Sequence, residues 1–325
     1  MTSTAPSTGF LALFRRRLGD RPALPFAEFM ELALYDREQG YYRQARPRVG
    51  YGSGTDFFTA STSGPIFGEL ICAAAVTLLA GKNLREFTFV ELGAEPETSV
   101  LDRVEHPFGA VRTLRVADAV TLAGPCVVFS NELFDAQPFR RFIFERGAWR
   151  ELAVAERGGG LAETTIAATA PGVFPKVAPE GYVIDAPLAA VELLRRIAGQ
   201  PWKGLFLAAD YGKSWRELAE ATPQGTARAF FQHTQSNDLL ARPGSQDLTA
   251  HVCWDWLAAA LEEAGFGPAI VESQEAFFIR HAADFISATA AAEAARFSRK
   301  KLSLLQLLHP SHLGQKFQVL HAQRL

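Results

Sequence analysis

Three apolar runs of one form constrain the fold more than any other feature of this 325-residue chain. They are "FTFVELG" (87–93), "CVVFSNELFD" (126–135) and "GLFLAADYG" (204–212), and each passes from strand-forming residues into a polar or glycine-bearing turn. Such runs are typical of parallel strands that are covered on both faces, and the carboxyl ends of these strands meet at one edge of a sheet. The sequence therefore predicts an α/β fold with a ligand site at that edge.

Other segments predict helices and antiparallel strands around these runs. Apolar spacing indicates helices at 10–18, 25–35, 64–81, 187–199, 248–266 and 287–309, and strands at 111–118, 225–233, 269–279 and 316–324. Residues 140–169 alternate apolar and polar side chains around turn signals at 146–147 and 158–160, which predicts an antiparallel meander. The chain has no internal repeat and no low-complexity linker. We expect one compact unit with an N-terminal helical and loop region (1–85) and a Rossmann-like core with insertions (86–325).

Composition excludes several classes of partner. A net charge of -2 and a pI near 6.4 argue against nucleic acid and anionic membranes. No apolar run has the length of a membrane span. The three cysteines, Cys72, Cys126 and Cys253, lie far apart in the sequence. This separation predicts that they are small buried side chains of a protein in a reducing, cytoplasmic setting. The first 20 residues resemble an organellar transit peptide weakly, and the alternative is a frayed tail before the first helix. No segment has the spacing of metal ligands, and nothing in the sequence predicts an oligomeric state.

The stretch "VELGAEPETSV" is the first candidate ligand loop. A strand that ends in Glu91-Leu92-Gly93 and turns into a helix could present backbone N–H groups to a ligand, with Glu91 accepting from an amine or hydroxyl. Only Gly93 remains of a three-glycine pattern, and Glu95 and Glu97 add negative charge, so both features argue against a dinucleotide. A cationic sulfonium cofactor without phosphate is penalised far less. The alternative is that these acids simply open a helix.

Spacing gives a second test of that loop. An acid that binds a ribose is expected about 20 residues after the glycine, near Thr113, but Glu105 comes early and Asp118 comes late. Only 38 positions separate Gly93 from Asn131, whereas two βα units need about 60. Either one βα unit is trimmed or the strand order differs from the expected one.

The segment "SNELFDAQPF" is the stronger candidate. Asn131, Glu132 and Asp135 follow the apolar "CVVF" within five positions, and Pro138 closes the segment. An amide and two carboxylates at a strand's carboxyl end could orient a cationic nitrogen for alkyl transfer. The alternative is an N-cap by Asn131 with the two acids in a first helical turn. We expect a protein substrate or partner at residues 131–138.

Two further segments carry candidate side chains. "GSGTDFFTAST" (52–62) contains Phe57 and Thr59 and predicts an aromatic lid. "SQDLTAHV" (245–252) places Asp247, Thr249 and His251 before a predicted helix. Asp247 could be an N-cap only, and a solitary histidine is more often a satisfied polar residue than a catalyst. No GxSxG nucleophile elbow occurs.

Taken together, these segments resemble the MidA-like family of S-adenosylmethionine-dependent methyltransferases, relatives of the mitochondrial complex I assembly-factor arginine methyltransferase. The resemblance rests on "FAEFMELALYDREQGYY", "GTDFFTASTSGPIFGEL", "FVELG", "SNELFDAQPFRRF", "LAADYG", "ARPGSQDLTAHV" and "GQKFQVL", which follow one another in the family's order. It implies a class I methyltransferase sheet with an added N-terminal helical and loop region. The pattern departs on the cofactor side, where the loop reads "GAEPET" and the stretch that holds the second strand and the ribose acid looks deleted.

The resemblance also implies roles for single residues. Glu91 and Gly93 belong to the methionine-binding loop, and Asp118 is the candidate replacement for the ribose acid. The remaining roles are cofactor covering by Phe57 and Thr59, and methyl acceptor binding by Asn131, Glu132 and Asp135.

Two hypotheses from different classes follow. The first is an S-adenosylmethionine-dependent methyltransferase acting on a protein nitrogen, by resemblance an arginine, with Glu132 and Asp135 holding the guanidinium. The second is a catalytically silent binding or assembly protein that keeps the acceptor edge, because Glu95, Glu97 and the short 93–131 segment count against the cofactor. A hydrolase that uses His251 would need a nucleophile, and the sequence offers none.

Overall fold

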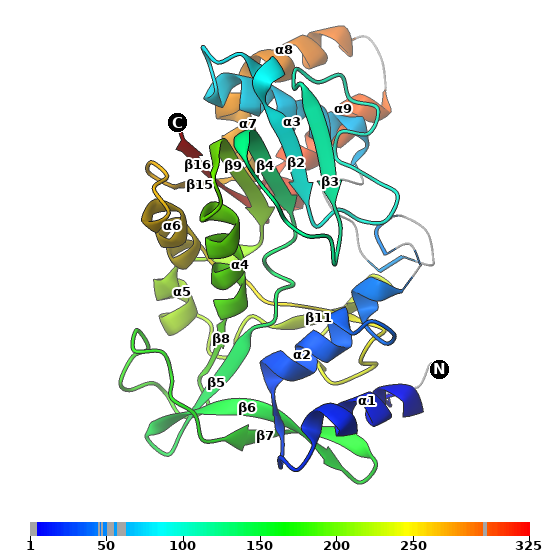
Figure 1. Cartoon of the computed structure of the whole chain (residues 1–325), viewed down its shortest axis with the longest axis vertical. Helices are drawn as coiled ribbons and strands as arrows, with labels where there is room; N and C mark the ends of the chain where they lie inside the picture. The colour runs from blue at the N-terminus through cyan, green and yellow to red at the C-terminus, as the bar shows by residue number, and fades with distance from the viewer. Residues whose placement is uncertain (1–4, 45, 47, 51–54, 57–62, 295–297) are drawn as a thin grey trace.

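The structure, a computed structural model, describes residues 5–44, 46, 48–50, 55–56, 63–294 and 298–325. A six-stranded sheet with the order β15-β16-β9-β4-β2-β3 forms the centre of one half of the molecule (Figure 1). Strands β3, β2, β4 and β9 are parallel, β16 pairs antiparallel with β9, and β15 pairs antiparallel with β16. The strands are β2 (Thr88–Leu92), β3 (Ala110–Leu114), β4 (Gly124–Asn131), β9 (Trp202–Asp210), β15 (Ile270–Ser273) and β16 (Gln318–Arg324). The predicted α/β fold is confirmed.

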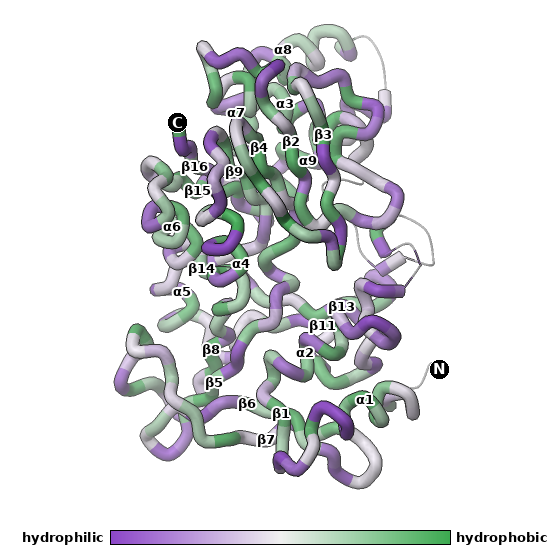
Figure 2. The backbone as a smooth tube through the Cα atoms, viewed as in Figure 1, coloured by the Kyte–Doolittle hydropathy of each residue, from purple (hydrophilic) through white to green (hydrophobic). Residues whose placement is uncertain are grey.

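Helices cover both faces of this sheet, which explains why the strands read as continuous apolar runs. Val127 and Phe129 of β4 face a core formed with α3 (Pro65–Leu78), α7 (Gln274–His281) and α9 (Arg299–Leu308). Cys126 and Val128 point to the opposite core, formed with α4 (Leu188–Ala198) and α6 (Trp254–Glu263). Figure 2 shows the hydrophobic colour concentrated along these central strands.

A second, antiparallel sheet forms the other half of the molecule (Figure 1). Its order is β1-β6-β5-β8, with β7 paired to β6, so the predicted meander is confirmed. Arg146 and Gly147 both have positive φ at the β5–β6 turn, as tight hairpin turns require. The strands are β1 (Leu24–Pro25), β5 (Arg140–Glu145), β6 (Ala148–Arg157), β7 (Gly160–Ile166) and β8 (Val183–Ala186).

The N-terminal region contributes to both halves. Helices α1 (Thr8–Leu18) and α2 (Phe26–Tyr35) pack against the antiparallel sheet, whereas α3 packs against the central sheet. A small sheet with the order β12-β11-β13 lies beside α2. The remaining elements are β10 (Gly212–Lys213), α5 (Trp215–Glu220), β11 (Arg228–Phe231), β12 (Thr234–Ser236), β13 (Asp247–Thr249), β14 (Val252–Cys253), α8 (Ala283–Ala292), and short turns of helix at Tyr41–Arg43, Leu84–Glu86 and Pro310–Gly314.

Several predicted elements were wrong. The helix expected after Gly93 is absent, because residues 93–109 form turns instead. The strand predicted at 111–118 is present as β3 beside β2, so the expected deletion of the second strand is wrong, and what is trimmed is the helix on each side of it. The strand expected at 269–279 ends at Ser273, whose hydroxyl accepts the N–H of Ala276 and starts α7. The helix expected from residue 248 begins at Trp254, and that expected at 287–309 is divided into α8 and α9.

The structure also bears on two expectations drawn from composition, the burial of the cysteines and the lack of a membrane span. Cys72, Cys126 and Cys253 are all buried and free, as predicted. In the described parts of the chain, no helix combines the length and the apolar character that crossing a membrane requires.

Candidate functional site

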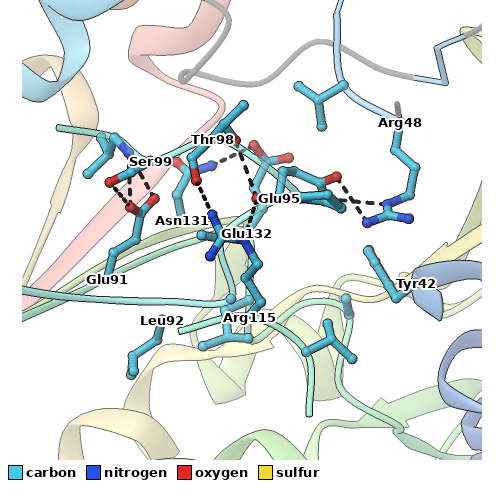
Figure 3. A pocket seen from close by; sticks show the side chains of 18 of the residues that line it. Tyr42, Arg48, Glu91, Leu92, Glu95, Thr98, Ser99, Arg115, Asn131 and Glu132 are labelled. Atoms are coloured by element: carbon cyan, nitrogen blue, oxygen red, sulfur yellow. Dashed lines mark hydrogen bonds and ion pairs between the residues drawn. The ribbon is translucent and has the colours of Figure 1, made fainter. Parts of the chain in front are cut away.

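A cavity of about 1170 Å³ opens at the carboxyl ends of β2, β3 and β4, where the sequence placed the ligand site. Its other wall comes from α2, β11, β13 and the residues between α2 and α3. This volume lies at the upper end of the range of small-molecule sites, so the cavity can take a cofactor and part of a substrate together. Figure 3 shows the side chains that line it.

The turn at Gly93 is held by β3. Gly93 has φ +73°, and a Cβ added there would lie 2.8 Å from the Cδ1 atom of Leu133. The N–H groups of Gly93 and Ala94 both donate to the carbonyl of Leu114, at 2.8 and 3.1 Å. These two N–H groups, predicted to face a ligand at a helix start, therefore bind the neighbouring strand.

Glu91 lines the cavity and fastens the turns that follow β2 (Figure 3). Its carboxylate accepts the hydroxyl of Ser99 at 2.6 Å and the N–H of Val100 at 2.9 and 3.1 Å. Burial raises the pKa of Glu91, although these hydrogen bonds act in the opposite direction. Its carboxylate therefore serves first to position residues 93–109.

Glu95 meets a buried arginine that the sequence analysis did not single out. Arg48 is 2% exposed, and its guanidinium lies 3.1 Å from the Glu95 carboxylate (Figure 3). Arg48 also donates to the carbonyls of Tyr41 and Gln44. Burial raises the pKa of Glu95, and the charge of Arg48 lowers it. The negative charge that counted against a ligand at Glu95 is therefore compensated, whereas Glu97 is exposed at the cavity's rim.

An arginine follows β3 at the position where an acid for a ribose was expected. Arg115 donates to the carbonyls of Glu95 and Thr98, at 3.3 and 3.4 Å. Asp118 is exposed, and its carboxylate accepts the backbone N–H of Arg115 at 2.8 Å. The cavity lining includes Arg115 but does not include Asp118.

The segment 131–138 after β4 brings its three predicted side chains together. Glu132 has φ +51°, which is strained for a side chain of this kind, and its N–H donates to the carbonyl of Ala209. The Asn131 amide donates to the Glu132 carboxylate at 3.0 Å. Asn131, Glu132 and Asp135 all line the cavity. The N-cap alternative is wrong, because the residues after Asn131 form turns and not a helix.

Asp210 ends β9 and holds this segment in place. Its Oδ2 atom accepts the N–H of Phe134 at 2.9 Å, and its Oδ1 atom accepts the N–H of Tyr211 at 3.0 Å. The sequence analysis placed Asp210 at the end of a strand but did not assign it to the site. The change from the apolar run "GLFLAA" to an aspartate at the strand's carboxyl end was the signal that could have identified Asp210 as a site residue.

Asp247 reaches the same cavity from β13 on the opposite wall. Its Oδ1 atom accepts both the hydroxyl of Tyr42 and the N–H of Leu248, each at 2.9 Å. The N-cap interpretation is wrong, because α6 begins seven residues later at Trp254. His251 does not line the cavity, and burial lowers its pKa to about 4.

Four carboxylates thus gather where the two walls meet: those of Glu132, Asp135 and Asp247 line the cavity, and that of Asp210 is buried and close enough to raise the pKa of Glu132 and of Asp135. Burial raises the pKa of Asp210 and of Asp247 to about 7, and it raises the pKa of the other two well above the usual range. Charge repulsion from Asp210 and Asp247 raises the pKa of Glu132 and of Asp135 further. Among the described residues, none forms an ion pair with any of the four, and the Oδ1 atoms of Asn131 and Asp135 have no hydrogen-bond partner.

Aromatic side chains complete this part of the cavity. Tyr35, Tyr42 and Tyr211 line it, and burial raises the pKa of each phenol. Tyr35 and Tyr42 stack with their ring centroids 5.5 Å apart. The predicted lid residues Phe57 and Thr59 lie outside the described residues, so their role stays a prediction. Carboxylates beside aromatic rings form a surface suited to a planar cation.

The fold and the site together define a class I methyltransferase-like protein. The chain belongs to the family described as "Putative S-adenosyl-L-methionine-dependent methyltransferase", whose model matches residues 72–271. The likeness to solved structures agrees on the fold. A protein from Burkholderia thailandensis bound to S-adenosylhomocysteine has a TM-score of 0.84 at 23% identity, with 97% of this chain and 92% of that chain covered. A native structure from the same organism gives a TM-score of 0.80 at 22% identity, covering 97% and 91%.

Two curated relatives are similar to this chain in sequence. "Protein arginine methyltransferase NDUFAF7, mitochondrial" of Mus musculus is 26% identical over 360 residues, which covers 90% of this chain and 79% of the relative. The protein of the same name from Xenopus tropicalis is 29% identical over 144 residues, covering 42% of this chain and 31% of the relative.

Proposed function

We propose that this protein transfers a methyl group from S-adenosylmethionine to an arginine nitrogen of a protein substrate. The observation that carries the proposal is a group of buried carboxylates beside stacked tyrosines, with Glu132, Asp135 and Asp247 lining the cavity and Asp210 next to them, and none of the four forms an ion pair with another described residue. Buried carboxylates without a cation are costly, and a guanidinium offers the planar set of donors that matches them. The name of the mouse relative supports the same acceptor.

The residues around the Gly93 turn fit the cofactor. A side chain at Gly93 would be strained by the positive φ and would require Leu133 to shift, and Glu91 holds the following residues in place. An apolar part of the cavity lies beside the turn and suits the faces of an adenine ring, with lining from Leu114, Val116, Ala117, Val120, Leu193 and Ile197. When bound, the cofactor supplies an electrophilic methyl group on a cationic sulfonium. The proposed ribose contact of Asp118 requires its side chain to turn toward the cavity, which it does not line in this structure.

The protein's own part in the reaction is to bind, orient and deprotonate the acceptor. Arginine is essentially always protonated, so the carboxylates must stabilise the cation and fix the plane of the guanidinium. A proton leaves the nitrogen when its bond to carbon forms. Asp135 is suited to accept that proton, because its Oδ1 atom has no hydrogen-bond partner in the described structure and its pKa is raised by burial. Asp210 keeps this segment in position through Phe134.

The experiment begins with calorimetric titration by S-adenosylmethionine and S-adenosylhomocysteine. We expect micromolar binding, which corresponds to about -8 kcal/mol. Methyl transfer is then measured by mass spectrometry on arginine peptides, with the same peptides carrying lysine as a control. Asp135→Asn should lower kcat/KM at least about 100-fold and leave cofactor affinity unchanged. Equal methylation of the lysine peptides would remove the arginine assignment.

The silent binding protein remains the alternative because of two specific contacts. The N–H groups of Gly93 and Ala94 bind Leu114, and Arg115 takes the position of the ribose acid. Absence of binding up to millimolar cofactor would favour this alternative, and capture of a protein partner at residues 131–138 would then define the function. The predicted cytoplasmic location stays a prediction, since the mouse relative is named as mitochondrial.

A further inference from the structure

The antiparallel edge of the central sheet carries two histidines and a glutamate that the methyltransferase site does not use. Glu272 lies in β15 and His321 in β16, and the register pairs His321 with Ile270, two residues from Glu272 on the same face. His281 is the last residue of α7, which packs on β15 and β16. None of the three lines the cavity.

The three side chains converge on one point. The Nε2 atoms of His281 and His321 lie 3.0 and 3.1 Å from the same Glu272 Oε2 atom, and all three atoms are within 4.8 Å of one another. The two imidazoles meet edge to face, with their centroids 5.2 Å apart. The ring of Phe277 packs against both of them and fixes their orientation.

A small outward shift of these atoms would give the distances of a metal site. Ligand atoms about 2.0–2.2 Å from a tetrahedral zinc ion are about 3.4 Å from one another. Two imidazole nitrogens and one carboxylate oxygen also form a donor set used by divalent transition metals. The other Glu272 oxygen, Oε1, faces Arg280 at 2.5 Å, so the guanidinium neutralises that oxygen and leaves Oε2 to the histidines.

We propose that Glu272, His281 and His321 form a binding site for a divalent transition-metal ion such as Zn²⁺. Glu272 and His321 are nearly buried, at 6% and 5% side-chain exposure, whereas His281 is 13% exposed and opens the site to solvent. The ion joins β15, β16 and α7, and therefore fastens the final strand to the sheet. Its place outside the cavity makes it a structural site and not a catalytic one.

The test uses tag-free, full-length protein that has been stripped of metal. Zinc retained after addition of ZnCl2 and desalting is measured by mass spectrometry, and we expect about one ion per chain. Zinc in excess should raise Tm by about 5 °C. MgCl2 at the same concentration should leave Tm unchanged, because Mg²⁺ prefers an all-oxygen site.

Variants locate the ion. His281→Ala, His321→Ala and Glu272→Gln should each retain less than a tenth of the wild-type zinc. His312→Ala is the matched control, because His312 is exposed and its ring lies 5.2 Å from that of His309, so it reports adventitious binding by surface histidines. Wild-type protein that retains no more zinc than His281→Ala, or retention lost in His312→Ala alone, overturns the site.

A measurement on the wild-type protein tests the site even if the variants do not fold. Co²⁺ bound through histidine in a four-coordinate site gives intense visible absorption, whereas hexa-aqua Co²⁺ is nearly colourless. We expect that absorption to saturate at one equivalent of CoCl2 and to be displaced by ZnCl2. Failure to develop it argues against the site even if every variant proves unstable.

Discussion

Asp247→Asn should stabilise this protein above neutral pH although it changes a residue of the proposed site. The aspartate is buried, and the two hydrogen bonds that it accepts from described residues, from the hydroxyl of Tyr42 and from the N–H of Leu248, both end on Oδ1. An asparagine can keep both bonds with its carbonyl oxygen. The substitution therefore removes the charge and leaves the geometry in place.

The magnitude follows from the pKa. Burial raises the pKa of Asp247 to about 7, whereas a carboxyl in an unfolded chain titrates near 3.9. Below about pH 3.9 both states are protonated and the carboxyl costs nothing. The cost grows as the pH rises toward 7, because only the unfolded state ionises freely, and it reaches about 4 kcal/mol. An amide NH2 left without an acceptor would cost about 1–3 kcal/mol, so a net gain of at least about 1 kcal/mol is expected at pH 8.

The assay is urea unfolding of wild-type and variant protein at pH 8, 6.5 and 5. The gain should be largest at pH 8 and should decline as the pH falls. Asp238→Asn is the matched control, since Asp238 is exposed and accepts one backbone bond from Ala241. A variant that is less stable than wild type at pH 8, or a gain that does not change with pH, would refute the reasoning. The same variant should bind an arginine peptide more weakly.

Three other predictions concern neighbouring positions. Asp210→Asn should gain at least about 1 kcal/mol less than Asp247→Asn in the same assay, because each Asp210 oxygen accepts a different N–H and an asparagine can serve only one. Gly93→Ala should weaken S-adenosylhomocysteine binding in calorimetry, whereas Gly124→Ala, at a similar positive φ with open space around it, should not; equal affinity in both variants would contradict the crowding argument. Arg48→Met should lower unfolding stability by about 3 kcal/mol, because it strands a partly buried carboxylate and removes two bonds to carbonyls; a loss below 1 kcal/mol in urea unfolding would show that the pair is solvated.

The sequence predicted the parts of the fold that depend on a local pattern. Buried parallel strands have to be apolar on both faces, so β2, β4 and β9 were visible as runs. The meander was visible because its turns need positive φ at Arg146-Gly147 and at Gly158-Gly159. The edge of the sheet was harder to predict. Strand β3 is largely exposed, and its connections to β2 and β4 lack the helices that usually mark a βαβ unit, so spacing alone suggested a deletion.

The acceptor site was predicted only on one wall. Asn131, Glu132 and Asp135 are carried by one segment, and a strand end is sufficient to bring them together. Asp247 joins them because β13 packs beside α2, and its partner Tyr42 is 205 positions away in the chain. Contacts at such separation are set by the packing of whole elements, and no local spacing encodes them.

The proposed metal site shows the same limit more sharply. A search for metal-ligand spacing recognises ligands that one hairpin or one helix turn brings together, and it found none here. Glu272 is 9 positions from His281 and 49 from His321, and the three lie on two strands and a helix. The strand pairing is what puts Glu272 and His321 on one face, because a shift of one residue in register would turn His321 to the other side of the sheet. Such a site becomes predictable once the order and register of β15 and β16 are known, so register, and not residue spacing, is the quantity from which sites of this kind should be sought.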